Sequence, residues 1–327
     1  MMYEDDNFEK WYENISNKFK EELIQLEETV KKEKENNRYR FKISIVIFII
    51  IISIFIDFGL KFNIMNIIGG IIMFGILFIL PILIVVILTD HKESTRQRIN
   101  MKKAIINIMI KSFDTNIEYY DKEGIAPEVY NKASVEYYDY YYSDHLMTFS
   151  VKSNYKLQMA ETETQYIHTD SSGEKNIRVA FSGTFATLNT PKTFKERVYI
   201  KKDMHNGKDN KVKKLPYKDM RIELDFQEFE EKFDVYASNK IIAMQLLTSD
   251  VMLLLDDFYK YMQREFEITI KNDNIYIRIW NGLTFSNSLT KGNELDKELI
   301  YKNYRTINFI LNISSKLIEL INETPYL

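Results

Sequence analysis

Two long apolar runs near the N-terminus limit what this 327-residue chain can become. The first reads ISIVIFIIIISIFIDFGL over 43–60, and the second reads IMNIIGGIIMFGILFILPILIVVIL over 64–88. As helices they would be about 27 and 37 Å long, which brackets the roughly 30 Å hydrocarbon core of a bilayer. The sequence therefore predicts a transmembrane helical hairpin over 43–88.

The charges that flank this hairpin predict its orientation. Several Lys and Arg residues precede the first run and follow the second, whereas the connecting loop holds only Lys61, close to Asp57. Because cytoplasmic flanks carry the excess of basic residues, we expect both termini in the cytoplasm. Glycines and a proline in the second run are expected to let the helices pack closely: Gly69, Gly70, Gly75 and Pro81.

The composition and motifs assign no catalytic residue. The chain has no cysteine, which excludes disulfides, thiolate metal sites and a thiol nucleophile. Its four histidines show no spacing that would place two on one helix face, so a metal site would need the fold to assemble it. Phosphate-binding, dinucleotide-binding and nucleophile-elbow motifs are absent. We therefore expect no catalytic site, no cofactor and no metal.

Helical patterns flank the predicted membrane hairpin. Over 1–42, apolar residues recur at steps of three and four, which predicts a cytoplasmic amphipathic helix beginning near Phe8 and Tyr12. This helix would suit a coiled coil or packing against the chain's own second helical segment. Over 89–135, one helix is expected to continue to about Tyr120 and another to start at Pro127, forming a juxtamembrane stalk.

The remainder, 136–327, is predicted to be a cytoplasmic α+β domain of mostly antiparallel strands and several helices. Tyrosines from Tyr137 to Tyr142 are read as a sheet face rather than a ligand site. Five strands are expected between Asp144 and Asp225, with a turn at Asp170 to Gly173. Later segments are expected as a short helix across 226–233, a strand at 235–236, helices across 240–247 and 250–263, a hairpin turning at 271–274 and a final amphipathic helix.

Smaller features are interpreted structurally. Gly183, beside Ser182 in a strand pattern, is expected to mark a bulge or a close backbone approach. Asp256 and Asp257 are expected to be solvated charges rather than a catalytic pair, because adjacent helical residues point about 100° apart.

One segment is locally basic. Ten Lys and Arg against four acids lie between Lys195 and Arg221. Beside an anionic membrane such a loop would be attracted to lipid head groups. Binding of nucleic acid is disfavoured, because few aromatic residues lie among the basic ones. The alternative is a solvated loop that binds no partner. The residues proposed for contact with an anionic surface are Lys201, Lys202, Lys208, Lys211, Lys213 and Lys214.

Three sequence blocks carry a family resemblance. They are AFSGTFATLNTPKTF, ELDFQEFEEKFDVYASNKIIAMQLLTSDVMLLLDDF and a strand pair ending NDNIYIRIW. Together they resemble the bacterial membrane family DUF3137, whose members join two N-terminal membrane helices to a cytoplasmic α+β domain. The resemblance is expected from the hairpin to about Phe285. It implies the fold and a bacterial cell membrane location, and it transfers no site because the family label denotes unknown function.

These observations lead to one hypothesis and two alternatives. The leading hypothesis is a non-enzymatic, membrane-anchored binding or scaffold module with the lipid bilayer as its integral partner. The first alternative is a two-helix membrane effector or pore that self-associates and is gated by its cytoplasmic domain. The second is an enzyme whose site residues converge only in the folded chain.

Overall fold

The structure is a computed structural model of the chain. It describes residues 7–22, 24, 25, 28, 32, 35, 39, 102–113, 117–133, 136–152, 154–202, 220–224, 226–287, 289–291 and 294–323. The predicted hairpin over 43–88, with Gly69, Gly70, Gly75 and Pro81, lies outside these residues. Among the described helices, none is both long and apolar enough to cross a membrane.

The chain divides into two compact units. One unit consists of 13–108, in which Ile15, Phe19, Ile105 and Ile106 are buried on helical segments. The other unit joins residues 1–12 to 109–327 and holds the sheet. We call this second unit the sheet domain.

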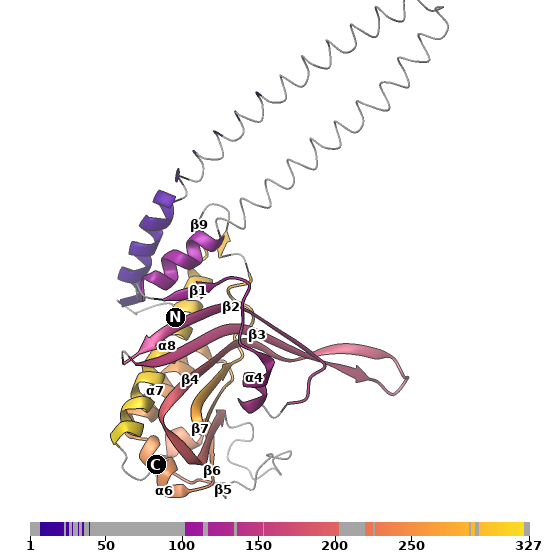
Figure 1. Cartoon of the computed structure of the whole chain (residues 1–327), viewed down its shortest axis with the longest axis vertical. Coiled ribbons are helices and arrows are strands. Elements are labelled where there is room, and N and C mark those ends of the chain that lie inside the picture. Colours follow the sequence, from indigo (N-terminus) through magenta and orange to yellow (C-terminus); the bar gives the residue numbers. More distant parts are fainter. Residues whose placement is uncertain are drawn as a thin grey trace, which may run out of the picture. The chain divides into compact units, whose positions relative to one another are not determined.

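An antiparallel sheet of seven strands forms the sheet domain (Figure 1). The strand order is β1-β2-β3-β4-β6-β5, and β7 pairs with the remaining edge of β4. The α+β class is therefore confirmed. The strands are β1 (Glu118–Tyr120), β2 (Tyr140–Val151), β3 (Tyr155–Thr169), β4 (Lys175–Lys202), β5 (Met220–Arg221), β6 (Phe233–Ala237) and β7 (Phe266–Ile279), with a separate pair β8 (Thr290–Lys291) and β9 (Glu294–Leu295).

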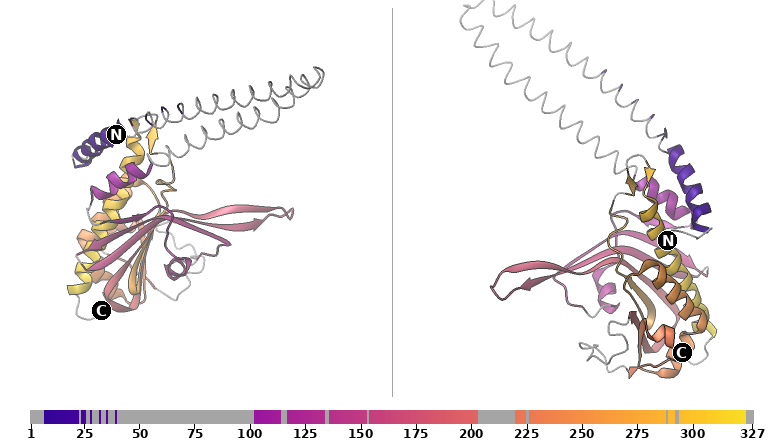
Figure 2. Two further views of the ribbon diagram at one scale, coloured as in Figure 1. Left: turned by 45° about the horizontal axis from the view of Figure 1, so that its top comes forward. Right: turned by 180° about the vertical axis from the view of Figure 1, so that it is seen from behind.

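Helices cover both faces of this sheet (Figures 1 and 2). On one face, α4 buries Tyr130 against Phe181 and Phe185. On the other, Phe309 of α8 stacks on Phe258 of α7 and contacts Phe266 of β7. The helices are α4 (Pro127–Ala133), α5 (Gln227–Glu230), α6 (Lys240–Leu246), α7 (Ser249–Met262) and α8 (Lys297–Glu323).

The long β4–β7 ladder bends in its middle. Its register shifts between Asn189 and Arg197, opposite a β7 segment where Asn272 has a φ of 57°. Eleven residues of straight strand would span about 36 Å. Glu267 and Arg278, eleven residues apart on β7, nevertheless form an ion pair. The ladder must therefore curve strongly between them.

This bend corrects two sequence predictions. The hairpin expected at 271–274 is absent, because both halves of β7 pair with β4. Two of the five strands expected between Asp144 and Asp225, those over 177–185 and 193–200, are one strand, β4. Asn and Asp tolerate the left-handed conformation that a hairpin turn requires, but the same conformation serves a bend within a strand. The turn signal was real, and its interpretation as a chain reversal was wrong.

Two further expectations near the start of the sheet domain and in α7 were wrong. The helix predicted to continue to about Tyr120 ends earlier, and Glu118–Tyr120 pairs with β2 as β1. Asp256 is buried between Lys232 and Lys260 rather than solvated. Tertiary contacts explain both differences. Pairing with β2 stabilises 118–120 as a strand. Lys232 and Lys260 compensate for the cost of burying the Asp256 carboxylate.

The ends of β3 and β4 extend beyond the rest of the sheet as an arm (residues 165–179; Figures 1 and 2). The arm begins at a bulge, because Thr164 pairs with Phe181 whereas Gln165 pairs with Val179. Its tip is the predicted turn, in which the Asp170 carboxylate accepts hydrogen bonds from the backbone of Ser172 and Glu174.

Candidate functional site

A β-bulge on β2 places a histidine beside an acidic pair. Asp144 pairs directly with Glu161 of β3, and the next registered pair is Met147 with Met159. Two residues of β2 therefore oppose one residue of β3, which is the arrangement of a bulge. His145, the first of the two, has a φ of 55°. This conformation re-aims the imidazole so that it lies close to Asp144 and Glu161.

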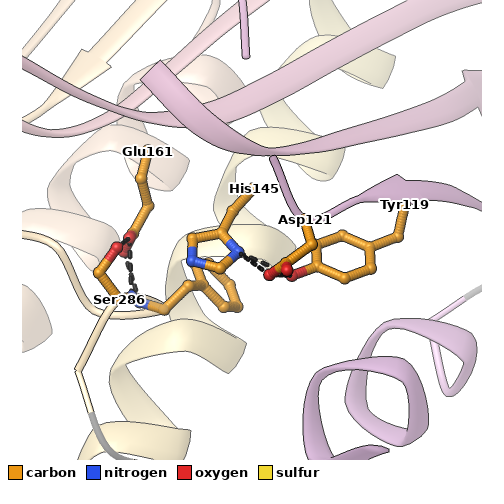
Figure 3. A network of polar contacts seen from close by, with 6 residues as sticks. Tyr119, Asp121, His145, Glu161 and Ser286 are labelled. Carbon is orange, nitrogen blue, oxygen red and sulfur yellow. Dashed lines mark hydrogen bonds and ion pairs between the residues drawn. The ribbon is translucent and has the colours of Figure 1, made fainter. Parts of the chain in front are cut away.

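Glu161 is held rigidly at the base of this cluster. Its side chain is buried and accepts hydrogen bonds from the backbone N–H of Phe285, from the Ser286 N–H at 2.8 Å and from the Ser286 hydroxyl at 2.6 Å (Figure 3). Burial raises the pKa of Glu161 to about 7, against the lowering effect of these hydrogen bonds, and the Asp144 charge adds to the rise.

The opposite side of His145 faces β1. Its Nδ1 lies 2.7 Å from the Tyr119 hydroxyl and 3.5 Å from a carboxylate oxygen of Asp121 (Figure 3). Tyr119 also donates a hydrogen bond to Asp121, at 3.2 Å. Burial raises the pKa of Tyr119, and the Asp121 carboxylate adds to that rise. The phenol therefore stays protonated and orients the imidazole.

The three side chains form a compact donor set, which we call the His145 cluster: Asp144, His145 and Glu161. Their nitrogen and oxygen ligand atoms all lie within 4.8 Å of one another. Asp144 is partly exposed, whereas the other two are buried, so the cluster opens toward solvent on one side. One imidazole and two carboxylates can exchange protons or hold a cation.

A second polar cluster lies inside the bend of the sheet. Arg278 is buried and binds Glu267 and Glu136, the latter at 2.9 Å, and it lies over the Trp280 ring. Burial alone would lower the pKa of Arg278, but these carboxylates raise it above its ordinary value. Because both acids are satisfied by one cation, we interpret this cluster as structural.

An apolar stripe lies on one face of the arm and the neighbouring end of β2. Cross-strand pairing places Ile167 opposite Ile177, and Gln165 opposite both Val179 and Tyr140. These residues share a face because side chains alternate along a strand. The stripe, called the arm patch, consists of side chains that are 40–62% exposed: Tyr140, Tyr142, Ile167, Ile177 and Val179.

The residues predicted to contact an anionic surface are only partly described. Lys201 and Lys202 lie at the end of β4, with their ammonium groups 5.4 and 5.3 Å from the rings of Tyr236 and Tyr259. Lys208, Lys211, Lys213 and Lys214 lie outside the described residues.

The sequence did not single out the His145 cluster. Asp144 and His145 are neighbours in sequence, but Glu161 joins them only through the register between β2 and β3. The sequence offered only weak indications of the cluster. His145 follows Asp144 at the start of a predicted strand, and Glu161 lies among other polar residues of the next one. The bulge that brings them together has no sequence signature of its own.

One family model matches part of the sheet domain. Residues 179–318 match the family model described as "Protein of unknown function (DUF3137)". The DUF3137 resemblance is confirmed. The DUF3137 match starts in β4, later than expected, and continues into α8, well beyond Phe285. It does not include the His145 cluster or the predicted membrane runs.

No curated protein matches this chain. The crystal structure of the mycobacterial trehalose monomycolate transport factor A, TtfA, is 8% identical, with a TM-score of 0.36, and the match covers 66% of this chain and 92% of that one. A similarity of this size says nothing about function.

Proposed function

We propose that this chain is a non-enzymatic binding module, anchored by the 43–88 hairpin in a bacterial cell membrane and exposing its sheet domain to the cytoplasm. The observation that carries the binding role is the arm patch. Three of its five large side chains lie on an arm that projects from the sheet, and the other two, Tyr140 and Tyr142, lie on the same face at the neighbouring end of β2. Large apolar side chains gathered on one exposed face mark contact sites on soluble domains.

A protein is the partner that fits this surface. Small molecules prefer concave pockets that bury most of their area, whereas the arm is an extended two-stranded ribbon. Tyrosine is also enriched at the centres of protein interfaces, and the patch holds Tyr140 and Tyr142. The arm patch therefore suits side-chain packing against another folded protein.

The anchoring half of the proposal is testable by cysteine labelling, because the chain has no cysteine of its own. We expect Asn63→Cys, between the apolar runs, to react with a membrane-impermeant maleimide on intact cells. Ser172→Cys, at the exposed arm tip, should react only after lysis. Labelling of Ser172→Cys on intact cells would reverse the orientation, and recovery of the protein without membranes would refute the anchor.

The binding half is testable by photo-crosslinking in cells. A photoreactive amino acid at position 177 should give a discrete crosslinked product. The matched control is position 176, which is exposed on the opposite face of the same arm and should give none. Ile167→Ser combined with Val179→Ser should abolish the product formed at 177.

The identity of the crosslinked product separates the candidate functions. A product with another protein supports the binding or scaffold module. A product with a second copy of this chain supports the self-associating effector instead. No product at position 177, or equal products at 176 and 177, would refute the arm patch as a binding surface.

A further inference from the structure

We propose that the His145 cluster is a binding site for one divalent transition-metal ion, with Asp144, His145 and Glu161 as ligands. This inference is independent of the arm patch and of the membrane anchor. It rests on four observations about the cluster: its donor types, its outer hydrogen bonds, its charge and its spacing.

The donor types favour a first-row transition metal. An imidazole nitrogen combined with carboxylate oxygens suits Zn²⁺, Fe²⁺ or Mn²⁺ better than Mg²⁺ or Ca²⁺, which prefer oxygen alone. Three protein ligands leave further positions for water, and Asp144 is the partly exposed member through which solvent reaches the cluster.

The outer hydrogen bonds match those around metal ligands. Metal-binding histidines usually pair their second ring nitrogen with a carboxylate or another polar group, which fixes the tautomer. His145 Nδ1 faces Tyr119 and Asp121 in this way. Glu161 is likewise oriented by Ser286 and Phe285, and its Oε1 accepts a single hydrogen bond from the described residues, leaving a lone pair.

The two carboxylates of the cluster favour a bound cation. Asp144 and Glu161 are direct cross-strand partners, and like charges in that position repel. Glu161 is also buried. Among the described residues, neither carboxylate has a Lys or Arg ion pair, and Asp144 has no hydrogen-bond partner, in contrast to the acids around Arg278. A divalent ion would supply the missing positive charge.

The spacing requires only a small contraction. Ligand atoms at about 2.1 Å from one ion lie roughly 3 to 4.2 Å apart. In the structure, the ligand atoms of Asp144, His145 and Glu161 lie within 4.8 Å of one another, which is a slightly wider spacing. Rotation of the Asp144 side chain, which no hydrogen bond in the described part of the chain restrains, would bring its carboxylate to an ion held by His145 and Glu161.

The test is metal binding by the full-length chain, purified in detergent and stripped with a chelator. Titration with Zn²⁺ should show one tight site per chain by calorimetry. Co²⁺ should give visible absorption bands that report the coordination geometry of the site and disappear when Zn²⁺ displaces it. Asp144→Asn should weaken Zn²⁺ binding about 10–100-fold, and His145→Asn should abolish the Co²⁺ bands.

The controls separate the cluster from adventitious histidine binding. Asparagine tolerates the positive φ at position 145, so circular dichroism should show that His145→Asn folds. His168→Asn removes another β3-region histidine outside the cluster and should leave binding unchanged. The proposal is overturned if no stoichiometric site exists, or if Asp144→Asn, which retains the shape of a partly exposed side chain, binds Zn²⁺ as tightly as the unchanged chain.

Discussion

Gly183 is a residue whose role follows from the space around it. It lies on β4, where the chain leaving β7 passes directly over it. A Cβ at this position would lie 1.9 Å from the Ile279 carbonyl oxygen and 2.9 Å from Asn281 Oδ1. The same asparagine accepts hydrogen bonds from the N–H and hydroxyl of Thr184. The expected close backbone approach at this glycine is confirmed.

We predict that Gly183→Ala destabilises the sheet domain strongly. The added methyl group must displace the Ile279 backbone, and overpacking of this kind costs about 1–3 kcal/mol or more. Thermal unfolding followed by circular dichroism in detergent measures the change. Gly173→Ala is the matched control: it has a φ of 86° but nothing within 4 Å, so only backbone strain of about 1 kcal/mol applies. Equal losses in both variants would contradict the steric argument.

At the scale of elements, α6 and α7 begin in different ways although they are adjacent in sequence. The Asn239 side chain accepts a hydrogen bond from the Ile241 N–H at 3.0 Å and caps α6. Thr248 precedes α7 without a side-chain cap, and its hydroxyl is buried without a hydrogen-bond partner among the described residues. Both residue types favour helix starts, yet only one of these two performs the capping role.

We therefore predict unequal costs for two alanine substitutions. Asn239→Ala should lose about 1 kcal/mol, because the Ile241 N–H loses its side-chain acceptor. Thr248→Ala should change the free energy of unfolding little, because its hydroxyl makes no bond to lose. Melting temperatures of the two variants test this, and Asn239→Asp should retain stability since aspartate also caps helices. A larger loss at Thr248 than at Asn239 would refute the assignment.

At the scale of the whole molecule, the two ends of the chain meet within the sheet domain. Phe8 is fully buried. The centre of its ring lies 4.6 Å from that of Tyr301 and 5.2 Å from that of Tyr304, both on α8. Trp11 also packs on Tyr304, and Tyr12 donates a hydrogen bond to the Leu295 carbonyl. Residues that precede the predicted membrane hairpin thus complete the core of the domain that follows it.

This arrangement predicts that Phe8→Ala destabilises the sheet domain although residue 8 is distant in sequence. Removing a buried phenylalanine costs about 3–5 kcal/mol. The readout is the melting temperature of the full-length chain, together with proteolysis of α8 below that temperature. Glu9→Gln serves as the control, because the side chains of the Glu9–Lys297 ion pair are about 42–43% exposed and ion pairs open to solvent contribute little. A melting temperature unchanged by Phe8→Ala would mean that this contact adds nothing to stability.

The sequence by itself determined the predicted membrane runs, the α+β class, the DUF3137 resemblance and most of the elements from β2 to α8. These features depend on local signals: apolar periodicity, turn residues and run length. Only the tertiary structure decided that β4 and β7 are single bent strands, and that Glu161 lies beside His145. Strand register, a bulge and a bend bring distant residues together, and the pairing energies that select them are not local to any segment of sequence.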